Sequence, residues 1–171
     1  MIFNPKSFGA KADGSHDDTN AIQQAIDKAF FSGGGRIVLK NGVFLSGTIY
    51  LKSNISLEID ASACLLASPD INSYGSDTHH NRYRNEPELD RCFIFAENAD
   101  NIELCGNGII NGNAEFFPNS NNIYRPMMIR FLNCRNIRLH DLRLYNSAAW
   151  TTAFLDSERI FISNIDIKNS K

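Results

Sequence analysis

The sequence predicts an all-β solenoid, a parallel β-helix, with one capping α-helix at its N-terminal end. Two observations support this prediction. Short strand-like segments follow one another with a single helix before them, which favours a sandwich, a barrel or a solenoid. In addition, residues 131–147 recur at residues 154–170 without a gap, and an ungapped repeat of this length favours the solenoid. We expect residues 1–171 to form a single domain, because this length suits one substantial core.

The segment "DDTNAIQQAIDKAFFSGGG" at residues 17–35 is the one convincing helix. Asp17, Asp18 or Thr19 can cap its first amides, and the three glycines after it can end it with little strain. Its apolar residues recur at helical spacing. They are Ala21, Ile22, Ala25, Ile26, Ala29 and Phe30. We expect this apolar face to cover the open N-terminal end of the solenoid, and we interpret Asp17 and Asp18 as capping residues rather than a catalytic pair.

The hydrophobic period changes to two after the glycines. Residues 36–68 alternate between apolar and polar, and the alternation returns at 92–112 and from 127 onward. Asn, Gly and Ser interrupt these runs, as is typical of turns. This pattern predicts many short strands.

The internal repeat aligns position 131 with position 154 and position 147 with position 170, a period in the low twenties. Two or three short strands in such a period match one coil of a parallel β-helix. We expect the aligned apolar positions to form ladders inside the solenoid and the Asn side chains at the bends to stack likewise. The aligned pairs include Phe131 with Phe154, Ile137 with Ile160, Leu139 with Ile162, Leu142 with Ile165, and Leu144 with Ile167. Residues 101–112 form a weaker copy with one inserted residue.

Composition limits the range of partners. The formal net charge is −2, with acidic and basic residues interspersed, which argues against a nucleic acid or an anionic membrane as partner. The N-terminus shows no basic region followed by an apolar run, and no apolar stretch is long enough for a membrane span. We therefore expect a cytoplasmic, bacterial protein without a membrane partner.

The pattern of cysteines and histidines argues against a metal site. Four cysteines are spread along the chain: Cys64, Cys92, Cys105 and Cys134. They form no C-x-x-C pair, and no histidine lies at zinc-ligand spacing. His79 and His80 lie in a polar insertion without further ligands, so we interpret them as part of a loop. We expect reduced, mostly buried cysteines, no bound metal and no cofactor.

Four stretches of the chain resemble the polygalacturonase-type enzymes of glycoside hydrolase family 28. They are residues 8–68, which include the helix, "NRYRNEPELDRCFIFAENADNIELCGNGIINGN", "YRPMMIRFLNCRNIRLHDLRLYNSAAWTTAFLD" and "RIFISNIDIKN". The resemblance implies a right-handed parallel β-helix of the pectin-lyase-like superfamily and a pectin-derived carbohydrate as ligand. It also implies hydrolysis of galacturonide bonds with inversion, which needs a carboxylic acid and a carboxylate set apart.

The signature motifs of those enzymes are absent from this sequence. It contains no Asn-Thr-Asp, His-Gly or Arg-x-Lys segment, and its one Asp-Asp pair lies at the helix start. The resemblance places the first motif just beyond Lys171. We therefore expect the N-terminal part of a longer family domain, truncated at its C-terminal end and inactive by itself. The alternative is a non-catalytic β-helix module that binds carbohydrate or docks to a partner.

Three residues are candidates for substrate binding, and no catalytic residue is assigned. Arg82 and Arg84 lie in the polar insertion 73–91, which can wall the substrate groove in the enzymes that the chain resembles. A guanidinium suits a sugar carboxylate. Trp150 has a ring that can stack on a sugar, although packing near a bend is our preferred interpretation.

The last predicted coil has no further coil to cover its apolar side. Its interior positions are Ile160, Ile162, Ile165 and Ile167. A fully buried aliphatic side chain contributes about 1.5–3 kcal/mol. We therefore expect self-association through this end, or its completion by further coils.

Overall fold

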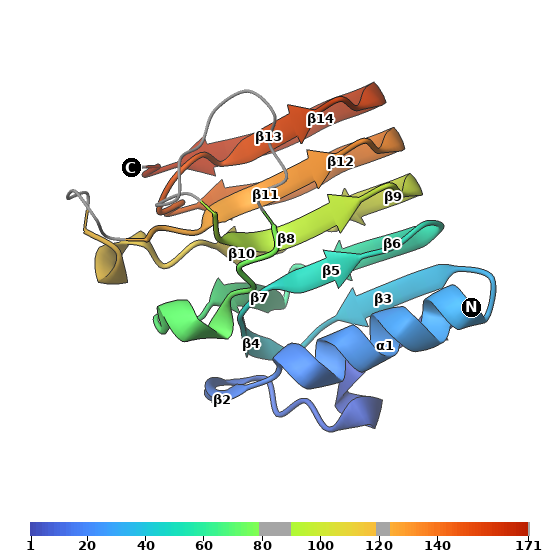
Figure 1. The fold of residues 1–171 in the computed structure, drawn as a ribbon. Coiled ribbons are helices and arrows are strands. Elements are labelled where there is room, and N and C mark those ends of the chain that lie inside the picture. Colours follow the sequence, from blue (N-terminus) through green and yellow to red (C-terminus); the bar gives the residue numbers. More distant parts are fainter. Residues whose placement is uncertain (79–89, 119–123, 171) are drawn as a thin grey trace.

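The computed structural model describes residues 1–78, 90–118 and 124–170. Figure 1 shows the chain winding into coils that stack on one another, from α1 (Thr19–Phe31) at one end to β14 (Glu158–Lys168) at the other. The predicted solenoid with a single α-helix is confirmed for the described residues, although two strands, Ile2–Phe3 and Asp13–Asp17, precede the helix.

Most strands have six residues or fewer, whereas β12 and β14 have 11 each. Three 3-10 turns lie between the strands in the described part of the chain. The bounds of the first half are β1 Ile2–Phe3, η1 Pro5–Phe8, β2 Asp13–Asp17, β3 Gly35–Leu39, β4 Gly42–Ser46, β5 Ile49–Leu51, β6 Ile55–Ile59, β7 Ala63–Ala67 and η2 Ile71–Ser73. The bounds of the second half are β8 Cys92–Glu97, β9 Asp100–Cys105, β10 Ile109–Asn111, η4 Ala114–Phe116, β11 Met127–Leu132, β12 Arg135–Tyr145 and β13 Thr152–Leu155.

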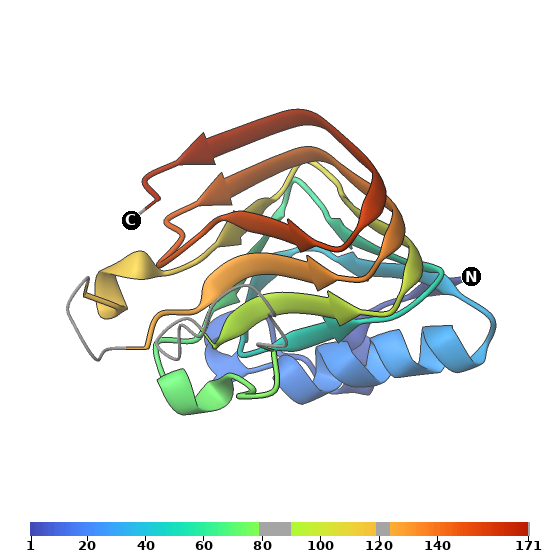
Figure 2. The same cartoon turned by 45° about the horizontal axis from the view of Figure 1, so that its top comes forward.

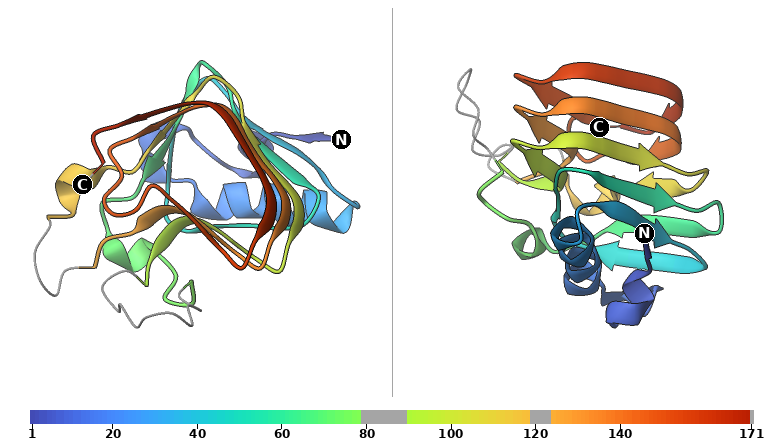
Figure 3. Two further views of the ribbon diagram at one scale, coloured as in Figure 1. Left: turned by 90° about the horizontal axis from the view of Figure 1, so that it is seen from above. Right: turned by 90° about the vertical axis from the view of Figure 1, so that its right-hand side faces the viewer.

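The strands pair in parallel and wrap three sides of the solenoid. One side is a four-stranded sheet in the order β13-β11-β8-β5. The other two sides form one ten-stranded sheet, because β12 passes through the corner between them and pairs first with β9 and then with β10. β14 follows β12 around the same corner (Figure 2). Seen along the axis, the coils superpose in a three-sided outline (Figure 3, left).

Ladders of aliphatic side chains run from coil to coil inside the solenoid. On one side, Ile37 pairs with Leu57, Leu57 with Leu104, Leu104 with Leu139, and Leu139 with Ile162. The side chains share a face because residues paired in register on neighbouring strands point to the same side of the sheet. The first four members are fully buried, so each removes its neighbours from water.

The strand register confirms both copies of the repeat. Ile137 lies opposite Ile160, as the ungapped alignment of the two segments predicts. In the weaker copy, Ile102 and Ile110 lie opposite Ile137 and Leu144. The chain between Ile102 and Ile110 is one residue longer than the chain between Ile137 and Leu144. The inserted residue therefore falls at the corner between β9 and β10.

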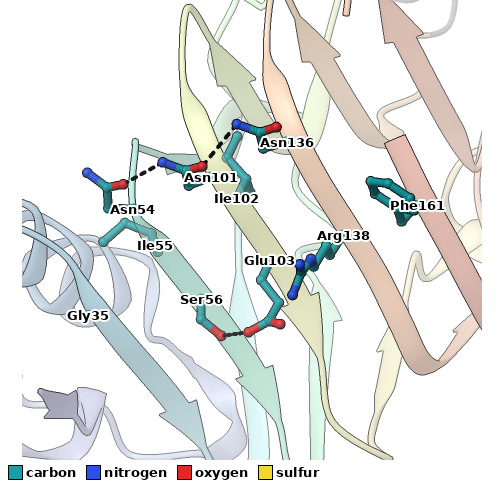
Figure 4. A pocket seen from close by; sticks show the side chains of 10 residues that line it. All are labelled: Gly35, Asn54, Ile55, Ser56, Asn101, Ile102, Glu103, Asn136, Arg138 and Phe161. Atoms are coloured by element: carbon teal, nitrogen blue, oxygen red, sulfur yellow. Dashed lines mark hydrogen bonds between the residues drawn. The ribbon is translucent and has the colours of Figure 1, made fainter. Parts of the chain in front are cut away.

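Asparagines occupy the corners in a left-handed backbone conformation. Asn54, Asn101 and Asn136 have φ of 63°, 59° and 54°, which Asn adopts more readily than most residues. Asn101 Nδ2 donates to Asn54 Oδ1 at 2.9 Å, and Asn136 Nδ2 donates to Asn101 Oδ1 at 3.1 Å (Figure 4). The predicted stacking of amides is thus confirmed. Two shorter stacks are Asn98 with Asn133 and Asn111 with Asn146.

Helix α1 lies across the N-terminal end of the coils (Figure 3). Its predicted apolar face is buried from Ala21 to Ala29, with Ile22 and Ile26 inaccessible to solvent. Phe30 is 38% exposed, so its assignment to the buried face is wrong. Its ring lies at the rim of the cap, where Lys52 Nζ approaches its centroid to 5.2 Å.

The two aspartates at the helix start have different structural roles. Asp17 Oδ1 accepts a hydrogen bond from the backbone N–H of Thr19 at 2.9 Å, as predicted for a cap. The prediction is wrong for Asp18, whose side chain caps no helix amide. Its buried carboxylate instead accepts from the backbone N–H groups of Lys11 and Ala12 at 2.7 and 2.9 Å. This carboxylate therefore ties the preceding segment to the helix.

The cysteines match their prediction. All four are free thiols, and Cys92, Cys105 and Cys134 are buried while Cys64 is half-buried. Burial raises the pKa of the Cys92 thiol to about 12. Among the described residues, no helix is both long and apolar enough for a membrane crossing.

Candidate functional site

One edge of the four-stranded sheet gathers cationic and aromatic side chains. Three successive coils reach this edge just before β8, β11 and β13. Backbone hydrogen bonds hold the coils together there: the Met127 N–H donates to the Arg91 carbonyl at 2.9 Å, and the Met128 N–H donates to the Trp150 carbonyl at 3.0 Å. We define the cation–aromatic edge as Arg91, Tyr124, Arg125 and Trp150.

The two arginines of this edge are held by neighbouring groups. The Arg91 guanidinium carbon lies 5.0 Å from the centroid of the Tyr124 ring, within the range of a cation–π interaction. Arg91 also forms an ion pair with Asp90, with Nη1 2.5 Å from Oδ1. Arg125 Nη1 donates to the Ala148 carbonyl at 3.2 Å. That bond orients the Arg125 guanidinium without cancelling its charge.

Trp150 projects from the protein and is 60% exposed. The preferred sequence interpretation, a packing role near a bend, is therefore wrong. Ala148 and Ala149 before it are buried, so the chain anchors itself on small residues and turns the indole outward. The other two candidates, Arg82 and Arg84, lie outside the described residues, as do His79 and His80.

The outer face of the four-stranded sheet is partly covered. Tyr50, Phe95, Arg130 and Ala153 lie side by side across its four strands. Arg130 is 1% exposed and donates from Nη1 to the Thr78 carbonyl at 2.6 Å. The segment that contains Thr78 therefore lies over these strands.

Tyr50 fastens the same covering segment at the other side of the sheet. Its hydroxyl donates to Asp77 Oδ1 at 2.6 Å. Burial and the Asp77 carboxylate raise the pKa of Tyr50 well above its usual range. The phenol therefore stays protonated and continues to donate.

The cation–aromatic edge has the chemistry of a binding surface for an acidic sugar. A planar guanidinium matches a carboxylate in geometry and charge, and an exposed aromatic ring offers an apolar face with a polar tip. Sequence reasoning named Trp150 but not Tyr124 or Arg125. The repeat gives no signal for them, because the paired residues of β11 and β13 are 23 positions apart, which sets Trp150 against Met127.

A groove lies on a different side of the solenoid, over β6, β9, β12 and β14. It has a volume of about 540 Å³ and is lined by ten residues, among them Phe161 and the Asn54–Asn101–Asn136 stack. Figure 4 shows Glu103 and Arg138 side by side on its floor, with the Ser56 hydroxyl turned toward the Glu103 carboxylate. Glu103 and Arg138 are the charged residues of this lining, one of each sign, so the groove has no strong preference for an anion or a cation.

The side chains of Glu103, Cys105 and His140 meet beside this groove. One ligand-type atom from each lies within 4.8 Å of the other two. Nothing in the spacing along the chain indicates this cluster, because His140 is distant in sequence from the other two residues. Only the winding of β12 onto β9 brings them together.

Known proteins are similar to this chain in both sequence and architecture. Residues 2–170 match the family described as rhamnogalacturonase A/epimerase, pectate lyase-like. The chain belongs to this family. Its polygalacturonase-like character, expected from the sequence, is thereby confirmed together with the pectin-lyase-type fold.

Curated relatives of this rhamnogalacturonase A/epimerase-like chain are longer than the chain itself. The exo-poly-alpha-D-galacturonosidase of Dickeya chrysanthemi is 36% identical over 121 residues, which cover 66% of this chain and 19% of that protein. Polygalacturonase-2 of Solanum lycopersicum is 29% identical over 183 residues, covering 99% of this chain and 37% of the relative. The chain thus spans between about a fifth and somewhat over a third of these relatives.

Solved structures identify the handedness of this family member's coil. The exopolygalacturonase of Thermotoga maritima superposes with a TM-score of 0.83 at 25% identity, over 98% of this chain and 46% of that one. A family 28 exopolygalacturonase of Yersinia enterocolitica superposes with a TM-score of 0.85 at 22% identity, over 99% and 39%. Both support the right-handed parallel β-helix expected from the sequence.

Proposed function

We propose that this chain supplies the N-terminal coils of a polygalacturonase-like glycoside hydrolase that acts on pectin-type galacturonide chains. The family and the polygalacturonase relatives support the class of substrate. Trp150, exposed at the cation–aromatic edge, is the observation that carries the assignment of a binding surface. A ring that is anchored by buried neighbours yet left in solvent is suited to stack on a sugar.

The arginines of the edge take the carboxylates of the substrate in this proposal. Arg125 bonds to the uncharged Ala148 carbonyl, which leaves its positive charge available. Arg125 is therefore the stronger candidate for binding a substrate carboxylate. Arg91 shares its charge with Asp90 and mainly holds the Tyr124 ring in place. Arg82 and Arg84, which share the insertion 73–91 with Arg91, remain proposed substrate contacts and lie outside the described residues.

The acid and the base of hydrolysis belong to further coils stacked on β13 and β14 in this proposal. Two carboxylic groups are needed for inversion, and the sequence lacks the motifs that would deliver them. By itself the chain is expected to bind galacturonides and to release no reducing ends from polygalacturonate. Sustained release of reducing ends by the purified chain, above a boiled control, would refute this part.

Binding can be tested separately from turnover. Titration of the chain with trigalacturonate, followed by NMR or calorimetry, should show weak saturable binding that is lost with rising salt. Replacing Trp150 with Ala should weaken it about two- to ten-fold, since aromatic contacts are worth about 0.5–1.5 kcal/mol. Phe31→Ala is the matched control, because Phe31 is also an exposed aromatic residue but lies on α1. Equal affinities of the two variants would contradict the assignment of the edge.

The exposed apolar residues of β14 bear on the proposed further coils. Ile162 and Ile167 are each 51% exposed, and they continue ladders that are buried in the preceding coils. We propose that further coils of the same domain cover them. Sedimentation at rising concentration tests the expected self-association of the uncovered end, and a constant monomer mass across that range would argue against it.

A further inference from the structure

The cluster of Glu103, Cys105 and His140 lies on the outer surface of the ten-stranded sheet, away from the cation–aromatic edge. Glu103 and Cys105 are alternate residues of β9, so both point outward on the same face. Leu139 pairs with Leu104 on the inside of the sheet, which sets the following residue, His140, beside Cys105 on the outside. Three side chains with different ligand atoms therefore meet on two neighbouring strands.

The His140 ring of the cluster is already oriented by two carboxylates. His140 Nδ1 lies 2.8 Å from Asp141 Oδ2, and His140 Nε2 lies 3.2 Å from Glu103 Oε1. A carboxylate can only accept here, so Nδ1 donates to Asp141 and Nε2 donates to Glu103. A metal ion can take the place of the Nε2 proton, while Asp141 keeps the proton on Nδ1. Asp141 is itself fixed by Asn164 Nδ2, which donates to its Oδ1 at 2.6 Å.

The two oxygens of Glu103 face different groups. Oε2 accepts from the Ser56 hydroxyl at 2.6 Å and lies 3.6 Å from Arg36 Nη2. Oε1 is thereby left facing His140 and the interior of the cluster.

We propose that Glu103, Cys105 and His140 form a binding site for a divalent transition-metal ion of the zinc type. The ligands are Glu103 Oε1, Cys105 Sγ and His140 Nε2, and the fourth tetrahedral position is open to water. Zinc prefers this mixture of oxygen, sulfur and imidazole ligands. Asp141 and Ser56 act as positioning residues, because a carboxylate behind a ligating histidine fixes its tautomer and orientation.

The distances suit this ion with a small adjustment. Zinc bonds of about 2.0–2.3 Å at tetrahedral angles separate neighbouring ligand atoms by about 3.3–3.6 Å. Glu103 Oε1 and His140 Nε2 are already 3.2 Å apart, whereas the Cys105 sulfur lies within 4.8 Å of one ligand-type atom of each of these residues. A modest closure at the sulfur, by rotation of the Cys105 side chain, completes the geometry.

Charge and protons balance at this site. The ion displaces the thiol proton of Cys105 and any proton on His140 Nε2, and both leave to solvent. The thiolate and the Glu103 carboxylate then neutralise the two positive charges of the ion. Arg36 lies 2.9 Å from Glu58 and 3.6 Å from Glu103, and Asp141 faces His140 Nδ1, so the charged groups around the site are themselves paired. Without a metal, the same groups form a hydrogen-bonded ion network, which is the competing explanation of the cluster.

Cobalt(II) is the direct probe of this proposal, because a thiolate ligand produces a charge-transfer absorption that a carboxylate or imidazole does not. The chain is stripped with a chelator and titrated with Co²⁺ and then with Zn²⁺, which should displace the cobalt. We expect one equivalent to bind with a thiolate-to-cobalt band. Absence of saturable binding, or binding without that band, would overturn the proposal on the wild-type chain alone.

Variants identify the ligands. Cys105→Ser should abolish the charge-transfer band, and His140→Gln should weaken binding at least about ten-fold, while Asp141→Asn should weaken it about 10- to 100-fold as the loss of an orienting partner. Cys64→Ser is the matched control, because Cys64 is a half-buried cysteine on β7 outside the cluster. Unchanged affinity in Cys105→Ser, or an equal loss in the control, would also overturn the site. Circular dichroism confirms that each variant is folded.

Discussion

The two ends of the solenoid are built from similar apolar residues, but these residues are buried at the N-terminal end and exposed at the last described coil. At the N-terminal end, α1 covers the first coil, and Ile22 and Ile26 are fully buried. At the last described coil, Ile162 continues the same interior ladder as Leu139, yet it is 51% exposed while Leu139 is inaccessible to solvent. The alternation of the strand places both inward, but a ladder residue is buried only when a neighbour lies on both sides.

The difference shows which interactions hold the coil together. The apolar face of each coil packs against the next coil, so every stacking contact adds stability, and local stability is lowest at the last coil. The polar corners show the same trend. The stack of Asn54, Asn101 and Asn136 runs through three coils, but the equivalent position of the last coil is Arg159, which has a left-handed φ of 57°.

The largest effect on the free energy of unfolding is expected from a substitution inside the ladder that contains Leu139 and Ile162. Leu139→Ala should lower the free energy of unfolding by about 2–5 kcal/mol, because it leaves a cavity among buried neighbours. Ile162→Ala, one coil further on, should cost at most about 1.5 kcal/mol, since half of its side chain already contacts water. Urea denaturation followed by circular dichroism measures both. Equal losses would mean that the last coil is covered in solution.

A smaller effect is expected at the covered end. Asp18→Asn should lower the free energy of unfolding by about 1.5–3 kcal/mol, because one hydrogen bond from a backbone amide to a charged acceptor is lost. The neighbouring exposed cap provides the control. Asp17→Asn retains an acceptor for the Thr19 N–H and should cost a few tenths of a kcal/mol at most, since Asn and Asp are about equal as caps. The same urea titration distinguishes them, and the reverse order would assign the helix anchor to Asp17.

The corner stack can be extended as a gain-of-stability test. Arg159→Asn should raise the free energy of unfolding by about 0.5–1.5 kcal/mol, because the new amide can donate to Asn136 Oδ1 and continue the stack. Arg159→Gly is the control that relieves the left-handed backbone without supplying an amide. If both variants gain equally, backbone strain and not amide stacking distinguishes the last coil.

The smallest effect on stability is expected when acid protonates Asp13, near the N-terminal end. Hydrogen bonds from the backbone amides of His16 and Ser15 lower the pKa of Asp13 to about 2. Because the folded pKa is depressed, its contribution is complete above the unfolded value of about 4 and is lost as the pH falls toward 2. Asp13→Asn should therefore flatten the fall of thermal stability between pH 4 and pH 2. An unchanged slope would show that these hydrogen bonds do not persist in solution.

Much of this protein follows from its sequence because a solenoid is built from local, repeated rules. The ungapped repeat aligns Ile137 with Ile160, and the structure keeps that register. The helix, its apolar face and the stacked corner amides follow from periodicity and backbone preference in the same way. The exception in the helix, Phe30, lies at the rim of the cap, where burial depends on neighbours rather than on spacing.

The functional surfaces depend on contacts between coils. Whether Trp150 packs or projects depends on what lies beside it, and no pattern along the chain contains that information. Likewise, Glu103 and Cys105 meet His140 only because β12 winds onto β9 in one register. The sequence by itself determined the coil, its ladders and its cap, since these arise from residues at fixed spacings. The tertiary structure decided which side chains from different coils share a surface, because that depends on the number of residues in every intervening turn.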